Sequence, residues 1–179
     1  IADTLKDDAK SAIASLKAQK LHTVMLTGDS ESAANAIAEE TGIDEVYSKL
    51  LPDEKLLKLQ EQRTKHGAVM FVGDGINDAP VLAGADCGVA MGSGADAAIE
   101  AADVVFMTSS VEAIPQAIAI GKKASRIAWQ NVVFALVVKA LVMILGLLGF
   151  ANMWMAVFAD TGVAMLCVLN SIRALKIQS

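Results

Sequence analysis

The chain has 179 residues, of which 54% are hydrophobic, and its formal net charge is −5. That length suits one ordinary domain, or a small domain joined to a membrane segment. The negative charge, without a basic stripe interleaved with aromatic residues, argues against nucleic acid as the main partner.

Composition divides the chain into two parts. Residues 1–126 carry most of the charge, whereas charged side chains become rare from Trp129 onward. We therefore expect a soluble domain over 1–126 and a transmembrane hairpin over 127–179. The two cysteines, Cys87 and Cys167, fall in different parts, so we expect no disulfide between them and a reducing compartment around the soluble part. The start at Ile1, with neither an initiator methionine nor a signal-peptide pattern, suggests a domain incomplete at its amino terminus.

Helical and strand patterns alternate through the first part. Helices are expected over 6–20 and 31–41 and from Pro52 onward, and strands over 22–27, 45–47, 68–72, 88–91 and 104–107. A continuous apolar run such as 68–72 is typical of a buried parallel strand. The repeated order of strand, turn and helix predicts an α/β domain around a largely parallel sheet.

Two hydrophobic stretches follow, at about 131–150 and 153–170, separated by Ala151-Asn152. Each is long enough to cross a hydrocarbon core of ~30 Å at ~1.5 Å per residue. The short break implies a tight hairpin with both outer ends on one side. Positive residues flank both outer ends and predict that this side, with the soluble domain, is cytoplasmic; they are Lys122, Lys123, Arg126, Arg173 and Lys176. The alternative is a buried helical hairpin in a soluble protein.

Two of the expected strands end in a glycine-acid turn, Thr27-Gly28-Asp29 and Gly73-Asp74-Gly75. Open parallel sheets bind ligands beyond the carboxyl ends of their strands, and glycines there let a bulky anion approach. Carboxylates such as Asp74 and Asp78 suit Mg²⁺, and Lys55 could supply positive charge beside a phosphoryl group. Taken alone, Asp74 could merely cap a turn, and Lys55 could be a solvated surface lysine.

The order of these motifs resembles the phosphorylation domain of P-type ATPases, a branch of the haloacid dehalogenase superfamily. The motifs are Thr27-Gly28-Asp29, Leu51 to Lys55, Gly73 to Pro80, Ala85 to Gly92 and Ala98 to Asp103. The resemblance implies that Thr27 hydrogen-bonds the phosphoryl oxygens and that Lys55 pairs with their charge. It also implies that Asp74 ligates Mg²⁺ and that Asn77 and Asp78 complete the phosphate and metal environment.

Several features of that family are missing or altered. The nucleophilic aspartate of its Asp-Lys-Thr-Gly-Thr motif is absent, and so is the ATP-binding domain that normally precedes a segment like Asp3 to Lys6. Lys6 replaces an arginine there, which puts a nucleotide contact in doubt. Ser30 replaces the asparagine that often follows Thr-Gly-Asp, but a short polar side chain can still cap the next helix.

Two charged residues lie inside the hydrophobic stretches, Lys139 in the first and Asp160 in the second. A charge at bilayer depth costs at least ~2.5–3.5 kcal/mol, so it normally faces a partner or an ion pathway. Counted from the hairpin, the two positions differ by ~6 Å along the helices, which predicts a Lys139–Asp160 pair. The pair could be structural, or Asp160 could be an oxygen ligand for a transported cation with Lys139 as the counter-charge.

Lys139 with Ala159-Asp160-Thr161-Gly162 resembles the zinc, cadmium and lead branch of the heavy-metal transporting P-type ATPases. The copper branch carries asparagine and tyrosine in the penultimate span, and Asn131 lies at the membrane edge instead. Family members complete the cation site with an intramembrane Cys-Pro-Cys, which this chain lacks. Cys167 is expected to pack as a small hydrophobe rather than to bind an ion. His22 and His66 are expected to lie in the soluble domain without companions, so neither is expected to bind metal.

The sequence therefore predicts the carboxyl-terminal portion of an ATP-driven exporter of zinc, cadmium or lead in the plasma membrane. The resemblance implies Mg²⁺ and ATP as cofactors, and an aspartyl-phosphate intermediate that needs the missing amino-terminal part of the same protein. One alternative is a truncated subunit or interaction module that is tethered to the membrane and has no catalysis. Another is a membrane-anchored phosphatase that borrows its nucleophile from elsewhere.

Overall fold

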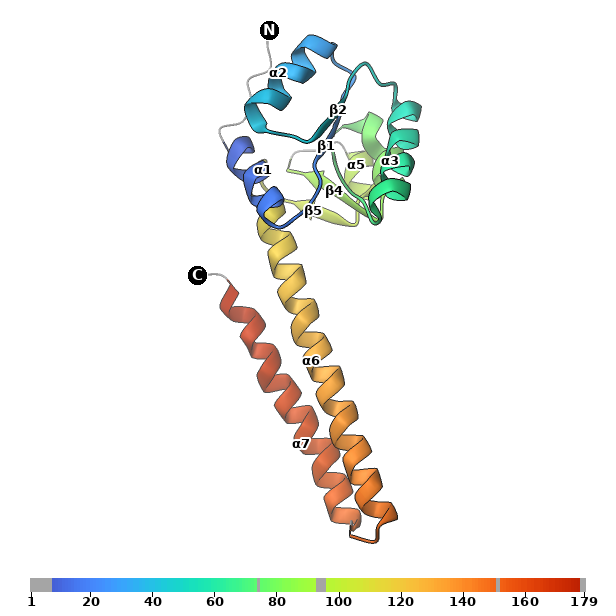
Figure 1. Ribbon diagram of the computed structural model, residues 1–179, viewed down its shortest axis with the longest axis vertical. Coiled ribbons are helices and arrows are strands. Elements are labelled where there is room, and N and C mark those ends of the chain that lie inside the picture. Colours follow the sequence, from blue (N-terminus) through green and yellow to red (C-terminus); the bar gives the residue numbers. More distant parts are fainter. Residues whose placement is uncertain (1–7, 74, 93–95, 151, 178–179) are drawn as a thin grey trace. The chain divides into compact units, whose positions relative to one another are not determined.

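The computed structural model describes residues 8–73, 75–92, 96–150 and 152–177, and the chain divides into two compact units, 1–115 and 116–179. The first unit alternates helices and short strands (Figure 1). Its elements are α1 (Ala9–Ala18), β1 (Val24–Leu26), α2 (Glu31–Thr41), β2 (Glu45–Tyr47), α3 (Pro52–His66), β3 (Met70–Gly73), the 3₁₀-helix η1 (Ile76–Asp78), α4 (Ala79–Gly84), β4 (Cys87–Met91), α5 (Asp96–Ala101) and β5 (Val104–Phe106).

Helix boundaries in this unit follow the capping residues in the sequence. Ser30 precedes α2, its hydroxyl accepts a hydrogen bond from the backbone N–H of Ala33, and Gly42 ends the helix at a φ of +79°. The expectation that Ser30 caps this helix is therefore confirmed. Pro52 opens α3, and the Glu54 carboxylate accepts a hydrogen bond from the backbone N–H of Leu51 at 2.8 Å, which satisfies one donor at the helix start.

The strands form two parallel sheets. β1 pairs with β2, with Val24 opposite Glu45, and β3, β4 and β5 pair in that order, with Val72 opposite Val89. The predicted α/β fold with parallel pairing is confirmed, but within the described residues the sheet is divided between β1 and β3. β1 and β3 are not hydrogen-bonded to each other, so each has one edge without a neighbouring strand among the described residues.

The core of the first unit lies between the larger sheet and the helices that follow its strands. α4 packs on β3 and β4, and α3 and α5 pack against α4. The most deeply buried large side chains are Leu59, Val81, Leu82 and Val89. Gly88, the second residue of β4, allows the close contact of this strand with α4, because a Cβ there would lie 2.5 Å from the backbone oxygen of Leu82.

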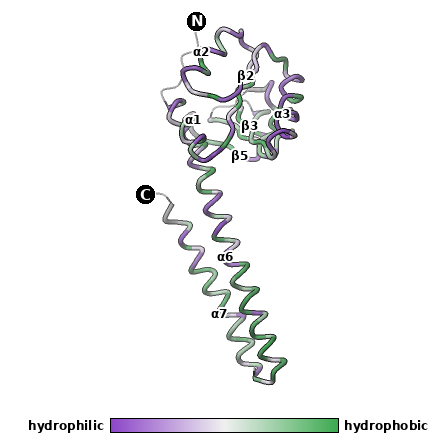
Figure 2. Tube along the Cα trace, viewed as in Figure 1, coloured by the Kyte–Doolittle hydropathy of each residue, from purple (hydrophilic) through white to green (hydrophobic). Residues whose placement is uncertain are grey.

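The second unit is a helical hairpin. α6 runs from Ala113 to Leu147, so it begins within the first unit, and α7 runs from Met153 to Ser171 and continues into the 3₁₀-helix η2 (Ile172–Ile177). Both α6 and α7 are long and apolar enough to cross a membrane. The predicted division at 126/127 falls inside α6, because the helix is continuous from residues with polar side chains into residues with apolar ones (Figure 2).

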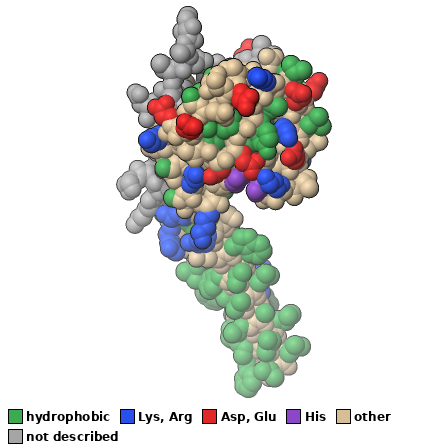
Figure 3. Space-filling view, turned by 45° about the horizontal axis from the view of Figure 1, so that its top comes forward, with side chains coloured by type: hydrophobic (Ala, Val, Ile, Leu, Met, Phe, Trp, Pro, Cys, Tyr) green, Lys and Arg blue, Asp and Glu red, His purple; other side chains and the backbone are tan. Residues whose placement is uncertain are grey.

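The connection between these helices is short, and two of its described residues show how it turns. Gly149 has a φ of +79°, and the Asn152 side chain accepts a hydrogen bond from the backbone N–H of Met155 at 2.9 Å, which caps α7. Figure 3 shows hydrophobic side chains over the helical part that holds this connection, with Lys and Arg side chains gathered at its other end. The sequence expectation of a hairpin between two hydrophobic stretches is confirmed.

Candidate functional site

Lys55 and Asp78 form an ion pair at the carboxyl end of the larger sheet. Lys55 lies in the first turn of α3 and Asp78 ends η1, and the distance from Lys55 Nζ to Asp78 Oδ1 is 2.8 Å. Both side chains are largely buried, with 16% and 15% of their surfaces exposed. Positive and negative charge are therefore brought together from parts of the chain 23 residues apart, in the region where a parallel sheet binds ligands.

Gly73 makes room for this pair. It is the last residue of β3, and a Cβ at this position would lie 2.9 Å from the Asp78 Cβ and 3.0 Å from Asp78 Oδ2. Any other residue would push the Asp78 carboxylate away from the strand end. Asn77 precedes Asp78 in η1, and its side chain is exposed. Asp74, the expected Mg²⁺ ligand, lies outside the described residues.

The turn after β1 is held by its own polar groups. The Thr27 hydroxyl donates to Asp29 Oδ2 at 2.7 Å and accepts from the Asp29 backbone N–H at 3.1 Å. The Thr27 backbone N–H donates to the Tyr47 carbonyl, and the Leu50 N–H donates to the Thr27 carbonyl, which ties the turn to the segment after β2. Within 8–73 and 75–92, no hydrogen bond or ion pair joins Thr27, Gly28 or Asp29 to Lys55 or Asp78.

The arrangement supplies the groups that an anionic ligand needs at a sheet edge. A hydroxyl follows β1, an ammonium group stands on α3, and a carboxylate follows β3. A cation and hydroxyl or N–H donors can neutralise a phosphoryl group, and carboxylate oxygens are the donors that Mg²⁺ prefers. The chemistry of the donor set therefore fits both a phosphate and Mg²⁺.

Lys139 on α6 and Asp160 on α7 form the ion pair predicted inside the hydrophobic stretches. The distance from Lys139 Nζ to Asp160 Oδ1 is 3.0 Å. Both side chains are largely exposed, at 62% and 71%, and they border an open cavity of about 450 Å³ along the two helices, on the hairpin side of the pair. The other residues of its lining are Val142, Met143, Gly146, Asn152, Met153, Ala156 and Ala159. The topological prediction of this pair is confirmed.

A polar cluster near the other end of the hairpin was not expected from sequence. The Asn131 amide donates to the Cys167 carbonyl at 3.1 Å and to Ser171 Oγ at 3.0 Å, and its oxygen accepts from Asn170 at 2.8 Å. The Cys167 thiol lies 3.7 Å from the Asn131 carbonyl, so the sulfur is engaged between the helices. Both cysteines are free, as expected. Only the pairing of the helices reveals this cluster, since Asn131 and Cys167 are 36 residues apart.

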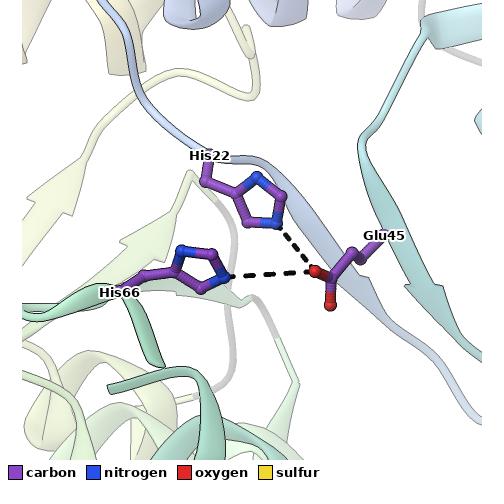
Figure 4. Close-up of side chains that lie close together, drawn as sticks. All are labelled: His22, Glu45 and His66. Carbon is purple, nitrogen blue, oxygen red and sulfur yellow. Dashed lines mark hydrogen bonds and ion pairs between the residues drawn. The ribbon is translucent and has the colours of Figure 1, made fainter. Parts of the chain in front are cut away.

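The expectation that His22 and His66 lack companions is wrong. Their rings stack with centroids 4.3 Å apart, and both approach the Glu45 carboxylate (Figure 4). His22 precedes β1, Glu45 begins β2 and His66 ends α3, so no local sequence pattern links them.

Comparison with known proteins identifies the family. Residues 1–86 match the family model of haloacid dehalogenase-like hydrolases. The whole chain is 50% identical to part of a cadmium, zinc and cobalt-transporting ATPase of Bacillus subtilis, and 98% of it is 49% identical to part of a zinc-transporting ATPase of Synechocystis. The chain spans only about a quarter of these relatives, 26% and 25% of their lengths.

A solved structure agrees in both sequence and fold. The crystal structure of a zinc-transporting PIB-type ATPase in its E2.Pi state superposes on 97% of the chain with a TM-score of 0.92 and 40% identity, and the match covers 28% of that protein. The agreement includes the α/β unit and the two apolar helices. The chain therefore belongs to the P-type ATPase family, of which it forms a portion.

Proposed function

We propose that the complete protein is an ATP-driven exporter of a soft divalent cation of the zinc, cadmium and lead group, and that this chain supplies half of its phosphate site and one of its cation ligands. The observation that carries the cargo assignment is the Lys139–Asp160 pair at 3.0 Å on two helices of membrane length. The relatives named as zinc and cadmium transporters support the same choice.

The phosphate half of the proposal rests on the turns after β1 and β3. Thr27 and the Gly28 and Asp29 turn would receive phosphoryl oxygens, and Lys55 would balance their negative charge. Asp74 and Asp78 would hold Mg²⁺, with Asn77 completing the polar surroundings, and the bound ion would offset charge on the transferred group. In the structure Lys55 already lies against Asp78, so an arriving phosphate would compete with the carboxylate for the ammonium group.

The nucleophilic aspartate would come from the rest of the ATPase. Among the described strands, β1, β2, β3 and β5 each have one edge without a neighbour, and β1 and β3 are the two that end next to the Thr27 and Asp78 segments. A further strand bearing the nucleophile would pair with the edges of β1 and β3, join the two sheets, and bring its carboxylate between Thr27 and Asp78. An aspartyl-phosphate would form there at the expense of ATP, which a separate part of the protein would bind.

Asp160 is the proposed oxygen ligand for the transported cation. It borders the cavity of about 450 Å³, where the rest of the protein's membrane spans would contribute sulfur ligands suited to zinc or cadmium. Lys139 would neutralise Asp160 when no cation is bound and would compete with the cation for the carboxylate. The lysines and arginines that flank the hairpin in the sequence favour a cytoplasmic position for the α/β unit, with the two helices in the plasma membrane.

Replacing Asp160 in the complete protein tests the cargo assignment. We expect Asp160→Ala to abolish zinc- or cadmium-stimulated ATP hydrolysis, since the carboxylate that binds the ion is gone. Lys139→Ala should retain metal binding, because it removes only the competing charge. The measurements are metal-stimulated phosphate release and metal bound per protein.

Val168→Ala is the matched control, since Val168 is an exposed residue of the same helix away from the cavity. It should leave stimulation near the unaltered level. A purely structural pair predicts a different result, in which Asp160→Ala and Lys139→Ala lower stability equally and metal stimulation survives in both. That result would remove Asp160 from the cation site.

Two other functions remain distinguishable by experiment. A membrane-tethered module without catalysis predicts that a complete protein with Lys55→Ala behaves as the unaltered protein in every phosphorylation assay. A membrane-anchored phosphatase predicts hydrolysis of phosphate esters by residues 1–179 alone. The proposed exporter predicts neither result, because Lys55 acts on the phosphoryl group and the nucleophile lies on another part of the protein.

A further inference from the structure

His22, Glu45 and His66 meet on the surface of the α/β unit. The distance from His22 Nε2 to Glu45 Oε1 is 3.1 Å, and the distance from His66 Nε2 to the same oxygen is 4.0 Å. One ligand atom from each residue lies within 4.8 Å of the other two. Figure 4 shows that both imidazole rings direct a nitrogen toward the same carboxylate.

Hydrogen bonds link the three segments of the chain that carry His22, Glu45 and His66. The Asp44 carboxylate accepts from the backbone N–H and hydroxyl of Thr23, at 3.0 and 2.7 Å, which fixes the residue after His22 to the residue before Glu45. Gln62 on α3 is 4% exposed and donates to Glu45 Oε2 at 3.0 Å. The backbone that carries these side chains is therefore held in place before a ligand binds, so less conformational entropy is lost on binding.

The Glu45 carboxylate is held in place by donors other than the histidines. The Tyr47 hydroxyl and the Gln62 amide donate to Glu45 Oε2 at 2.9 and 3.0 Å. The other oxygen, Oε1, is the one that both imidazole rings approach.

We propose that His22, Glu45 and His66 form a Zn²⁺ site on the α/β unit, separate from the cation site assigned to Asp160. Two imidazole nitrogens and one carboxylate oxygen are a known zinc donor set, which leaves the fourth tetrahedral position for water. Zinc ligands at ~2.0–2.1 Å from the ion are about 3.3 Å from one another. The atoms of this cluster therefore need to approach by at most about 1.5 Å from their separations of up to 4.8 Å. The two stacked rings, 22° from parallel, must also turn so that a nitrogen lone pair of each points at the ion.

Lys65 is the competitor for this site. Its Nζ lies 2.8 Å from Glu45 Oε1, the same oxygen that both histidines approach, and its side chain is 52% exposed. The ammonium group neutralises Glu45 when no metal is bound, and a metal ion would displace it into solvent. The alternative, a surface cluster of ion pairs that binds no metal, has the same geometry but predicts different responses to mutation.

The test is zinc binding to residues 1–179 in detergent, without a polyhistidine tag and in an Asp160→Ala background that removes the proposed membrane ligand. Equilibrium dialysis should find one equivalent of Zn²⁺ that is lost in His22→Gln and in His66→Gln. Losing a residue that only hydrogen-bonds a metal ligand lowers metal affinity by about 10- to 100-fold. Removing a direct ligand should therefore lower the zinc affinity by at least ~100-fold. Bound Co²⁺ should give the visible absorption of a tetrahedral complex, and the histidine variants should not.

Lysine variants keep the test informative even where a histidine variant folds poorly. Lys65→Ala should bind zinc more tightly, since the competing cation is gone, and unfolding cannot produce a gain in affinity. Lys10→Ala is the control, because Lys10 is an exposed lysine on α1 that carries the same charge, and its affinity should be unchanged. The proposal is wrong if the unaltered site binds no more zinc than the His22→Gln/His66→Gln double variant, or if Lys65→Ala leaves the affinity unchanged.

Discussion

At the scale of single residues, the adjacent acids Asp44 and Glu45 show how the fold sets charge. The Lys17 ammonium and the Thr23 hydroxyl lower the pKa of Asp44, and the Lys65 ammonium is the largest cause of the lowered pKa of Glu45. Each carboxylate is therefore stabilised by partners that are close only in the folded chain, which makes the stability of the α/β unit depend on pH.

Glu45→Gln should weaken that dependence. The pKa of Glu45 is about 2 in the folded state against an ordinary 4.5, so its stabilisation is complete above about pH 4.5 and is lost as the pH falls toward 2. We expect the thermal midpoint of the unaltered chain to fall more steeply below about pH 4.5 than that of Glu45→Gln, in a buffer with chelator.

Glu40→Gln is the control for this experiment, because Glu40 is an exposed glutamate near the end of α2. The thermal midpoint of Glu40→Gln should fall with decreasing pH as steeply as that of the unaltered chain. Equal slopes for Glu45→Gln and the unaltered chain would show that the contacts around Glu45 contribute nothing to folding.

At the scale of elements, close contacts of strands and helices depend on particular small or polar residues. β4 lies against α4 at Gly88, and α6 meets α7 at Asn131. The first contact is made possible by a missing side chain and the second by an amide that hydrogen-bonds three partners. Each contact gives a prediction of its own.

Gly88→Ala should destabilise the α/β unit by about 1–3 kcal/mol, since the added methyl would push the backbone of α4 off the sheet. The clash is with the Leu82 backbone, which no side-chain rotation relieves. Gly28→Ala is the control, because a Cβ there meets only an ordinary contact of 3.5 Å with the Leu50 oxygen. Chemical denaturation measures both, and equal stabilities would contradict the packing argument.

Asn131→Leu should loosen the hairpin at the end that holds Cys167. Hydrogen bonds between helices in a membrane contribute about 0.6 kcal/mol each, so losing those of Asn131 should weaken the contact by about 1–2 kcal/mol. We expect a Cys87→Ser chain to react about 5- to 30-fold faster with a membrane-permeant maleimide at Cys167 when it carries Asn131→Leu. Asn152→Ala, at the opposite end of α7, should leave this rate unchanged.

Sequence predicted local features better than long-range ones. The helix over 31–41 and its ends at Ser30 and Gly42 could be predicted because the interactions that cap a helix are local in sequence. The Lys139–Asp160 pair was readable because a short hairpin fixes which positions meet. The meeting of His22 with His66, and of Asn131 with Asn170, depends on packing between distant segments, which no spacing in one sequence reveals. The division of the sheet between β1 and β3 was missed for another reason, because the strand that we propose to join them is not part of this chain.

At the scale of the whole molecule, the chain is two units with different chemistry. The α/β unit ends at Pro115 and has a compact core, whereas the helical unit exposes apolar side chains along most of its length. The α/β unit is stabilised by the burial of apolar side chains away from water. The helical unit is stabilised by apolar surroundings and by contacts between its helices. Two such units are expected to unfold in separate steps.

Urea unfolding in detergent should therefore not be two-state. The single tyrosine, Tyr47, reports on the α/β unit, and the two tryptophans, Trp129 and Trp154, report on the helical unit. We expect the tyrosine signal to change at lower urea than the tryptophan fluorescence, while much of the helical circular dichroism persists. Coincident transitions from all three signals would show one cooperative unit instead.

The short connection between α6 and α7 also bears on how the protein is made. With Gly149 turning the chain and Asn152 starting α7, both helices are ready to enter the bilayer as one folded element. Because Lys139 and Asp160 meet within that element, their opposite charges would enter together as a neutral pair, without waiting for other spans to arrive. The contact to which we assign ion competition would thus also ease the insertion of this hairpin during synthesis.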